Sequence, residues 1–87
     1  MKLKGEFILR EMAGDKILVP VGQTALQFNG IIVLQPVAAL IWEGLAEGLD
    51  ELQLLERILE RFDVEREEAQ EDLKGFLTQL RSNGFLE

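Results

Sequence analysis

Apolar residues come in short runs over the first part of the chain and recur with a helical period over the second half. Residues 6–13 and 16–21 are short runs rich in apolar and β-branched side chains. Gly14-Asp15 between them suits a tight turn that needs positive φ, so the pattern predicts a β-hairpin. The stretch that follows, up to residue 30, predicts a loop, and residues 31–34 predict a third strand.

The predicted third strand, Ile31–Leu34, carries apolar side chains on both faces of its pleat. It lies within Ile17–Trp42, a stretch of 26 residues without a charge, although 29% of the whole chain is charged. One face of the strand can sit on a core, but the other face needs a cover of its own. Pro20 has no N–H to donate to a neighbouring strand. At Pro20, the second strand is therefore expected to have no hydrogen-bonded neighbour on one side.

Three amphipathic helices are predicted after the third strand. Pro36 suits the first position of a helix that ends near Gly48. Asp50 and Gln53 have the spacing of a capping box for the second helix. The last helix is expected at roughly 66–82, with Gly84 as a left-handed stop. The predicted buried faces are Val37, Leu40, Ile41 and Leu45, then Leu52, Leu55, Ile58, Leu59 and Phe62, then Ala69, Leu73, Phe76, Leu77 and Leu80.

The order of these elements predicts an α+β fold in which three N-terminal strands precede three helices. The last two helices are joined by a short turn, which is the outline of a helix-turn-helix unit with a small sheet beside it. A chain of 87 residues has room for one core, so a single domain over residues 1–87 is expected.

The composition leaves little with which to build a catalytic centre. The chain has no cysteine, histidine or tyrosine, which removes the thiolate ligands and the commonest general base. The only hydroxyl groups belong to Thr24, Thr78 and Ser82, and none stands in a recognisable nucleophile motif. We therefore predict that the protein is not an enzyme and uses no cofactor.

A metal site is not predicted either, although four acids crowd the start of the last helix. Their spacing lacks the pattern and the glycine of a calcium loop. Acids in a first turn are instead stabilised by the positive end of the helix dipole. The four acids are Glu67, Glu68, Glu71 and Asp72.

The net charge of −7 argues against nucleic acid and anionic membranes as partners, because both repel an acidic chain. A DNA-binding regulator stays an alternative because of the helix-turn-helix order. Its recognition helix, however, would place the acidic sequence "EREEAQED" next to the DNA phosphates, which repel it. Pro20, Gly22 and Pro36 interrupt the charge-free stretch, which argues against a transmembrane span. The start of the chain has no signal-peptide pattern, so a cytoplasmic location is expected.

Lys74 and Arg81 form a local basic edge on the last helix, seven residues apart. In an acidic chain such an edge could pair with acidic residues of a partner. A solvated helix flank, with Arg81 favoured by the helix C-terminus, explains the two residues equally well.

Several residues together resemble the PqqD-like family. These small proteins are named for pyrroloquinoline quinone biosynthesis, and their fold recurs as the precursor-peptide recognition element of ribosomally made, modified peptides. The family has a Leu-Asn pair at the end of the third strand and an Ile-Trp pair seven residues later. Leu34 and Ile41-Trp42 match this spacing, although Gln35 replaces the asparagine. Leu45 and Gly48, the hairpin and the two later helices extend the likeness over nearly the whole chain.

The resemblance implies a winged helix-turn-helix fold that binds the leader segment of a precursor peptide. In the family the peptide adds a strand to the exposed edge of the third strand, in a groove closed by the third helix. It is thereby presented to a modifying enzyme, which the resemblance implies to be a radical S-adenosylmethionine enzyme. Strand addition fits the composition, because a charged side chain in an apolar groove would be buried unpaired.

We therefore predict a peptide-binding chaperone without catalytic activity. A plain interaction or dimerisation domain is the other alternative, because an open strand edge would also accept a second copy. The main chain of residues 31–34 is expected to pair with the peptide, Leu73 or Leu77 to line the groove floor, and Lys74 and Arg81 to meet acidic leader residues. The predicted site residues are Ile31, Ile32, Val33, Leu34, Leu73, Lys74, Leu77 and Arg81.

Overall fold

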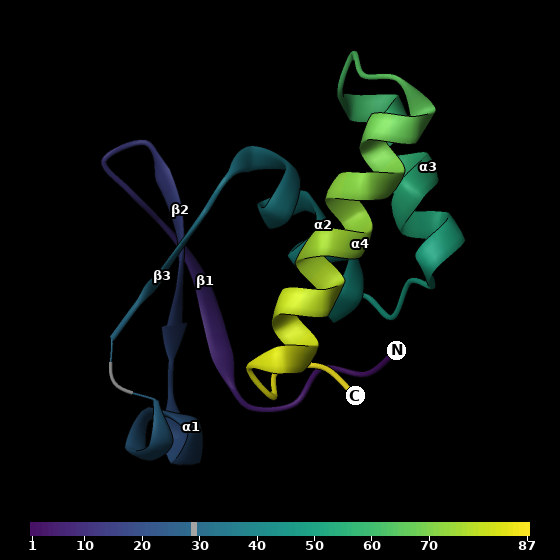
Figure 1. Cartoon of the computed structure of the whole chain (residues 1–87). Coiled ribbons are helices and arrows are strands. Elements are labelled where there is room, and N and C mark those ends of the chain that lie inside the picture. The colour runs from purple at the N-terminus through teal and green to yellow at the C-terminus, as the bar shows by residue number, and fades with distance from the viewer. Residues whose placement is uncertain (29) are drawn as a thin grey trace. The chain divides into compact units, whose positions relative to one another are not determined.

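The computed structural model describes residues 1–28 and 30–87, and its contacts divide the chain into two compact units (Figure 1). The sheet unit comprises Gly5–Pro36. The helical unit comprises Met1–Lys4 and Val37–Glu87. The chain therefore leaves the helical unit after four residues and returns to it within the first turn of a helix.

The predicted hairpin is present as β1, Phe7–Met12, and β2, Asp15–Pro20, which pair antiparallel. Its turn is Ala13-Gly14, one residue earlier than expected, because Asp15 pairs with Met12 and belongs to the strand. Ala13 has φ 52° and Gly14 has φ 87°. Two consecutive positive φ angles are what a two-residue hairpin turn of type I′ requires.

The third strand, β3, spans Ile32–Leu34 and pairs antiparallel with β2, so the sheet order is β1-β2-β3. Residues directly opposite each other share a face, and faces alternate along each strand. This register defines two faces. The Leu18 face carries Phe7, Leu9, Glu11, Lys16, Leu18, Pro20, Ile32 and Leu34, and the Val33 face carries Ile8, Arg10, Met12, Asp15, Ile17, Val19 and Val33.

A short helix, α1 (Gly22–Gln27), occupies the stretch that the sequence predicted as a loop. It buries no side chain and its N-cap residue makes no side-chain hydrogen bond. Thr24 ties it to the start of the hairpin, because its Oγ1 accepts the Glu6 N–H at 2.7 Å. An isolated turn without an apolar stripe leaves no helical period in the sequence, which is why the pattern failed to predict it.

The first predicted helix is α2, Pro36–Ala46; it ends near Gly48 as expected, and the structure shows that it ends in a Schellman motif. Gly48, with φ 88°, donates its N–H to the Leu45 carbonyl at 3.0 Å. The Leu49 N–H reaches back to the Gly44 carbonyl, also at 3.0 Å. Gly44 has no room for a side chain, because a Cβ there would collide with Leu54.

The last two helices are α3, Glu51–Arg61, and α4, Arg66–Ser82, and they pack against each other. The capping box is confirmed. Asp50 Oδ1 accepts the Gln53 N–H at 2.8 Å, and Gln53 Oε1 accepts the Asp50 N–H at 2.9 Å. Gly84, with φ 78°, ends α4 in a second Schellman motif.

The core of the helical unit follows the predicted pattern in part: Val37 on α2 is half-buried, and the largest departure is on α3. Leu54, Leu55 and Ile58 are buried there, whereas Leu52 is exposed. Leu52 stands about 200° around the helix from Leu54, so the two cannot share a face. On α4 the buried residues are Ala69, Leu73, Leu77 and Leu80, while Phe76, like Leu59 and Phe62 before it, is half-buried.

Both chain ends belong to the helical unit and pair with each other. Leu3 and Leu86 form an antiparallel bridge. The Lys4 N–H donates to the Phe85 carbonyl at 2.8 Å, and the Glu87 N–H donates to the Lys2 carbonyl at 2.9 Å. The first four residues are thus held by backbone hydrogen bonds to the segment that follows α4.

The α+β class and the order of three strands before the long helices are confirmed, with α1 as an addition. The winged helix-turn-helix arrangement and the single domain over residues 1–87 stay predictions. No helix in the described part of the chain is long and apolar enough to cross a membrane.

Candidate functional site

The candidate site begins with β3, because this strand lies at an edge of the sheet. One of its sides pairs with β2. Within the described residues, no strand pairs with its other side. An unpaired strand edge offers a row of main-chain donors and acceptors to another strand.

The register decides which main-chain groups of β3 face that open edge. In an antiparallel ladder, hydrogen-bonded pairs alternate with pairs that exchange no bond. Val21 donates its N–H to the Glu6 carbonyl at 3.0 Å, so β2 residues with odd numbers bond to β1 and those with even numbers point to β3. Lys16 and Leu18 therefore bond to Leu34 and Ile32, their partners in the register.

Val33 consequently directs its N–H and its carbonyl away from β2, toward the open edge. By the same alternation, the backbone nitrogen of Pro20, which carries no hydrogen, lies on the side of β2 that faces β3. Pro20 itself lies outside the part of β2 that pairs with β3, Lys16–Leu18. Pro20 thus lies where the strand has no partner within the described part of the sheet, as its lack of a donor predicted.

The side chains of residues 31–34 differ in their exposure. Leu34 is buried and Ile32 is half-buried, and both lie on the Leu18 face. Val33, on the opposite face, is exposed, as is Ile31, which directly precedes the strand. The uncharged segment therefore includes exposed side chains at the edge of the sheet as well as side chains on its buried face.

The four predicted site residues of the helical unit all lie on α4. Leu73 and Leu77 are buried, and Lys74 and Arg81 are exposed. Arg81 Nε donates to the carbonyl oxygen of Glu87 at 3.4 Å, so the Arg81 guanidinium lies beside Glu87. That these side chains and β3 line one groove stays a prediction.

Lys74 borders a hollow between α3 and α4 that the sequence did not predict. The hollow has a volume of about 290 Å³. Its walls are formed by residues of both helices, including the predicted site residue Leu73. The lining residues are Glu51, Leu52, Leu55, Gln70, Leu73 and Lys74. A hollow with an apolar floor and charged residues at its rim can hold an apolar side chain of a partner.

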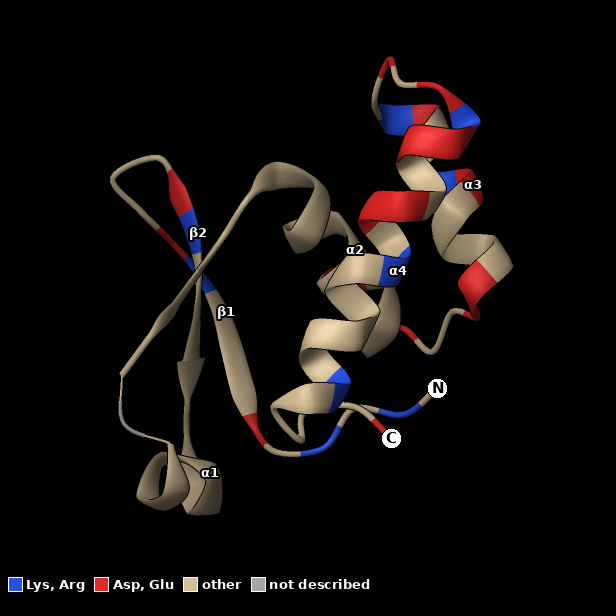
Figure 2. Cartoon of the chain, viewed as in Figure 1, with Lys and Arg blue, Asp and Glu red and all other residues tan. Residues whose placement is uncertain are grey.

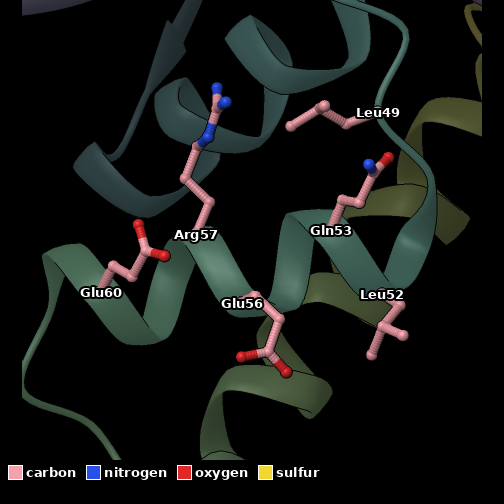
Figure 3. Close-up of a pocket in the computed structure, with 6 residues that line it drawn as sticks. All are labelled: Leu49, Leu52, Gln53, Glu56, Arg57 and Glu60. Atoms are coloured by element: carbon pink, nitrogen blue, oxygen red, sulfur yellow. The ribbon is translucent and has the colours of Figure 1, made fainter.

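A second hollow of about 350 Å³ lies along α3 and is the one drawn in Figure 3. Its lining includes Arg57, which binds Glu47 with an Nη1–Oε2 distance of 2.7 Å. This hydrogen bond lowers the pKa of the Glu47 carboxyl and raises the pKa of the Arg57 guanidinium. Glu47 and Arg57 belong to different elements, so no periodicity could have predicted the pair.

The hydroxyl groups show no arrangement for nucleophilic catalysis among the described residues. Thr24 Oγ1 is engaged by the Glu6 N–H, and Thr78 and Ser82 are exposed on α4. Within the described part of the chain, no group of three or more acidic residues is gathered so as to hold a metal ion. Figure 2 shows the acids at the start of α4 along its first turns.

The sequence pattern of the family described as coenzyme PQQ synthesis protein D (PqqD) matches residues 15–86. The chain belongs to the PqqD family. The resemblance inferred from Leu34 and Ile41-Trp42 is thereby confirmed. The match begins at β2 and runs through α4, so it takes in every predicted site residue of this PqqD-family chain. No curated protein matches it.

Two solved structures share the fold of this PqqD-family chain. TbiB1 in complex with the TbiA(beta) leader peptide is 25% identical with a TM-score of 0.79, over 100% of this chain and 95% of that chain. Lasso peptide synthetase B1 complexed with the leader peptide is 23% identical with a TM-score of 0.73, over 97% and 93%. Both neighbours thus bind a leader peptide.

Proposed function

We propose that this protein binds the leader segment of a ribosomally made precursor peptide by strand addition at β3 and presents it to a modifying enzyme. The observation that carries the proposal is Val33, whose N–H and carbonyl point to an open, uncharged strand edge. Membership of the PqqD family and the leader peptides bound to both structural neighbours support it.

The register of β3 specifies how a peptide would pair. We propose that the peptide runs antiparallel to β3, so that the residue opposite Val33 exchanges two hydrogen bonds with it, each worth a net ~0.5–1.5 kcal/mol. Its side chain lies beside Val33, and the two neighbouring peptide side chains lie beside Ile32 and Leu34 on the Leu18 face. The peptide therefore needs apolar residues two apart, as an alternating strand provides.

The residues of α4 complete the proposed site. Leu73 or Leu77 supplies its apolar floor, and Lys74 and Arg81 pair with acidic residues of the leader. The modifying enzyme is proposed to be a radical S-adenosylmethionine enzyme, as the resemblance implies. In this proposal the protein is a single cytoplasmic binding domain that performs no chemistry itself.

A nitrogen-15 NMR titration tests the proposal, with synthetic peptides encoded beside the gene as ligands and scrambled peptides of the same composition as controls. We expect one peptide to shift the amide signals of residues 31–34 and of residues 73–81. Shifts confined to the α4 residues would overturn strand addition. A folded protein that responds to none of the peptides would overturn peptide binding and leave a plain interaction domain.

A further inference from the structure

The Val33 face of the sheet is apolar and largely uncovered. Its large side chains Ile8, Met12 and Val33 are 40%, 59% and 57% exposed. Ile17, in the middle of the face, is buried at 3% exposure, and Val19 is half-buried. Three exposed apolar side chains from two strands, β1 and β3, gather on one face, unlike a single exposed leucine, which needs no explanation.

Two charged residues of opposite sign stand on this face, Arg10 and Asp15. Arg10 lies opposite Ile17, and Asp15 lies two residues from Ile17 on β2. The two charges are thus offset by ~6.7 Å along the strands and ~4.8 Å across them. Neither has an ion-pair partner within the described part of the chain, whereas Lys16 and Glu11, on the opposite face, lie 3.9 Å apart.

We propose that the Val33 face binds the same face of a second copy of this chain. A two-fold axis between two such faces makes each contact occur twice, so Arg10 of each copy meets Asp15 of the other. Stacked sheets lie ~10 Å apart, a gap that an arginine and an aspartate can span together. The apolar side chains of the two faces fill the space between them.

The charge distribution favours a second copy as the occupant. The chain carries a net −7, so two copies repel each other over most of their surface. The Val33 face is an exception, because its one cation and one anion cancel. The acidic residues are concentrated instead after the sheet, with 13 of the 16 between Glu43 and Glu87.

The size of the face predicts a weak dimer. A sheet of three strands, the longest of six residues, measures ~20 Å by ~15 Å. This is smaller than the ~800 Å² per partner of a standard stable interface. Association is therefore expected in the ~10 µM to ~1 mM range, and reversibly.

Sedimentation equilibrium of the peptide-free protein from ~10 µM to ~2 mM tests the proposal at ~0.15 M salt, where repulsion between the two acidic chains is largely screened beyond ~8 Å. We expect the mass to rise toward that of a dimer. Arg10→Glu and Asp15→Arg should each weaken association at least tenfold, because each turns two attractions into two repulsions. Arg61→Glu makes the same charge change on α3, which contributes no residue to the Val33 face, and should leave association unchanged.

A mixture of the two face variants gives the decisive result. Each variant alone is expected to stay monomeric, but in a mixed pair the introduced glutamate meets the introduced arginine, and Arg10 still meets Asp15. The mixture should therefore recover the association of the unchanged chain. A monomer at every concentration would overturn the proposal. So would a dimer that is insensitive to Arg10→Glu, because that dimer would use another surface, such as the open edge of β3.

Discussion

Replacing Val33 by proline tests the open edge directly, because it removes one N–H and leaves the β2–β3 ladder intact. The register directs the Val33 N–H away from β2, and no strand among the described residues pairs with that side. Proline is tolerated at strand positions whose donor side is unpaired. The expected result is a folded protein with impaired peptide binding.

The magnitude follows from the one hydrogen bond that the variant cannot make. The peptide carbonyl opposite position 33 loses its donor, and an unsatisfied buried acceptor costs about 1–3 kcal/mol. Peptide affinity should fall about 5-fold to 150-fold, since 1.4 kcal/mol corresponds to a tenfold change. The stability of the free protein should fall far less than in a variant whose proline removes a ladder hydrogen bond of the sheet.

Two matched variants separate the causes. Val33→Ala removes the exposed side chain and keeps the N–H, so it reports the contribution of the side chain alone. Leu34→Pro removes an N–H that pairs with Lys16 and should unfold the sheet. Urea unfolding gives the stability of each variant, and isothermal titration with the peptide identified by NMR gives its affinity.

Two results would refute the reasoning. If Val33→Pro were as destabilising as Leu34→Pro, the Val33 N–H would be bonded inside the protein and the edge would be closed. If Val33→Pro were stable and bound the peptide as tightly as the unchanged chain, binding would not use the main chain of β3.

Three further predictions concern stability and are measured by urea unfolding. Ala13→Asn should stabilise the protein by ~1 kcal/mol, because asparagine adopts the positive φ of this turn more readily than alanine; an unchanged midpoint would argue against strain there. Gly44→Ala should destabilise it by ~1–3 kcal/mol, because the new methyl group meets Leu54; stabilisation, as helix propensity alone predicts, would contradict this packing. The lowered pKa of Glu47 means that its bond to Arg57 stabilises the fold above pH 4.5, the usual pKa of a glutamate, and that this contribution is lost as the pH falls below it. Glu47→Gln should therefore lower stability at pH 7 and not at pH 3, and an equal loss at both would remove the charge as the cause.

The helices could be predicted from the sequence because their signals are local. Asp50 and Gln53 stand three residues apart and form the capping box that this spacing predicts. Gly48 and Gly84 end their helices because only a residue that tolerates positive φ fits there. The exception is Leu52, which was predicted to be buried but is exposed, while Leu54, two residues on and about 200° around the helix, fills the core instead.

The sheet could be predicted less completely because its pairing is not local. The apolar run of residues 31–34 predicted a strand with two apolar faces, but not which of its main-chain groups would remain unpaired. That depends on the register between β2 and β3, which a sequence pattern does not contain. The ionic contact of Glu47 with Arg57 was missed for the same reason, since it joins two separate elements.

The pairing of Met1–Lys4 with the segment after α4 has a practical consequence for protein engineering. Because Leu3 and Leu86 pair antiparallel, the first and last residues lie next to each other, and a linker of a few residues can join them. The Ala13-Gly14 turn is exposed and offers a place to open the chain. A circular permutant of this design should fold, and it would carry a fluorescent reporter on the hairpin, within the same sheet as β3.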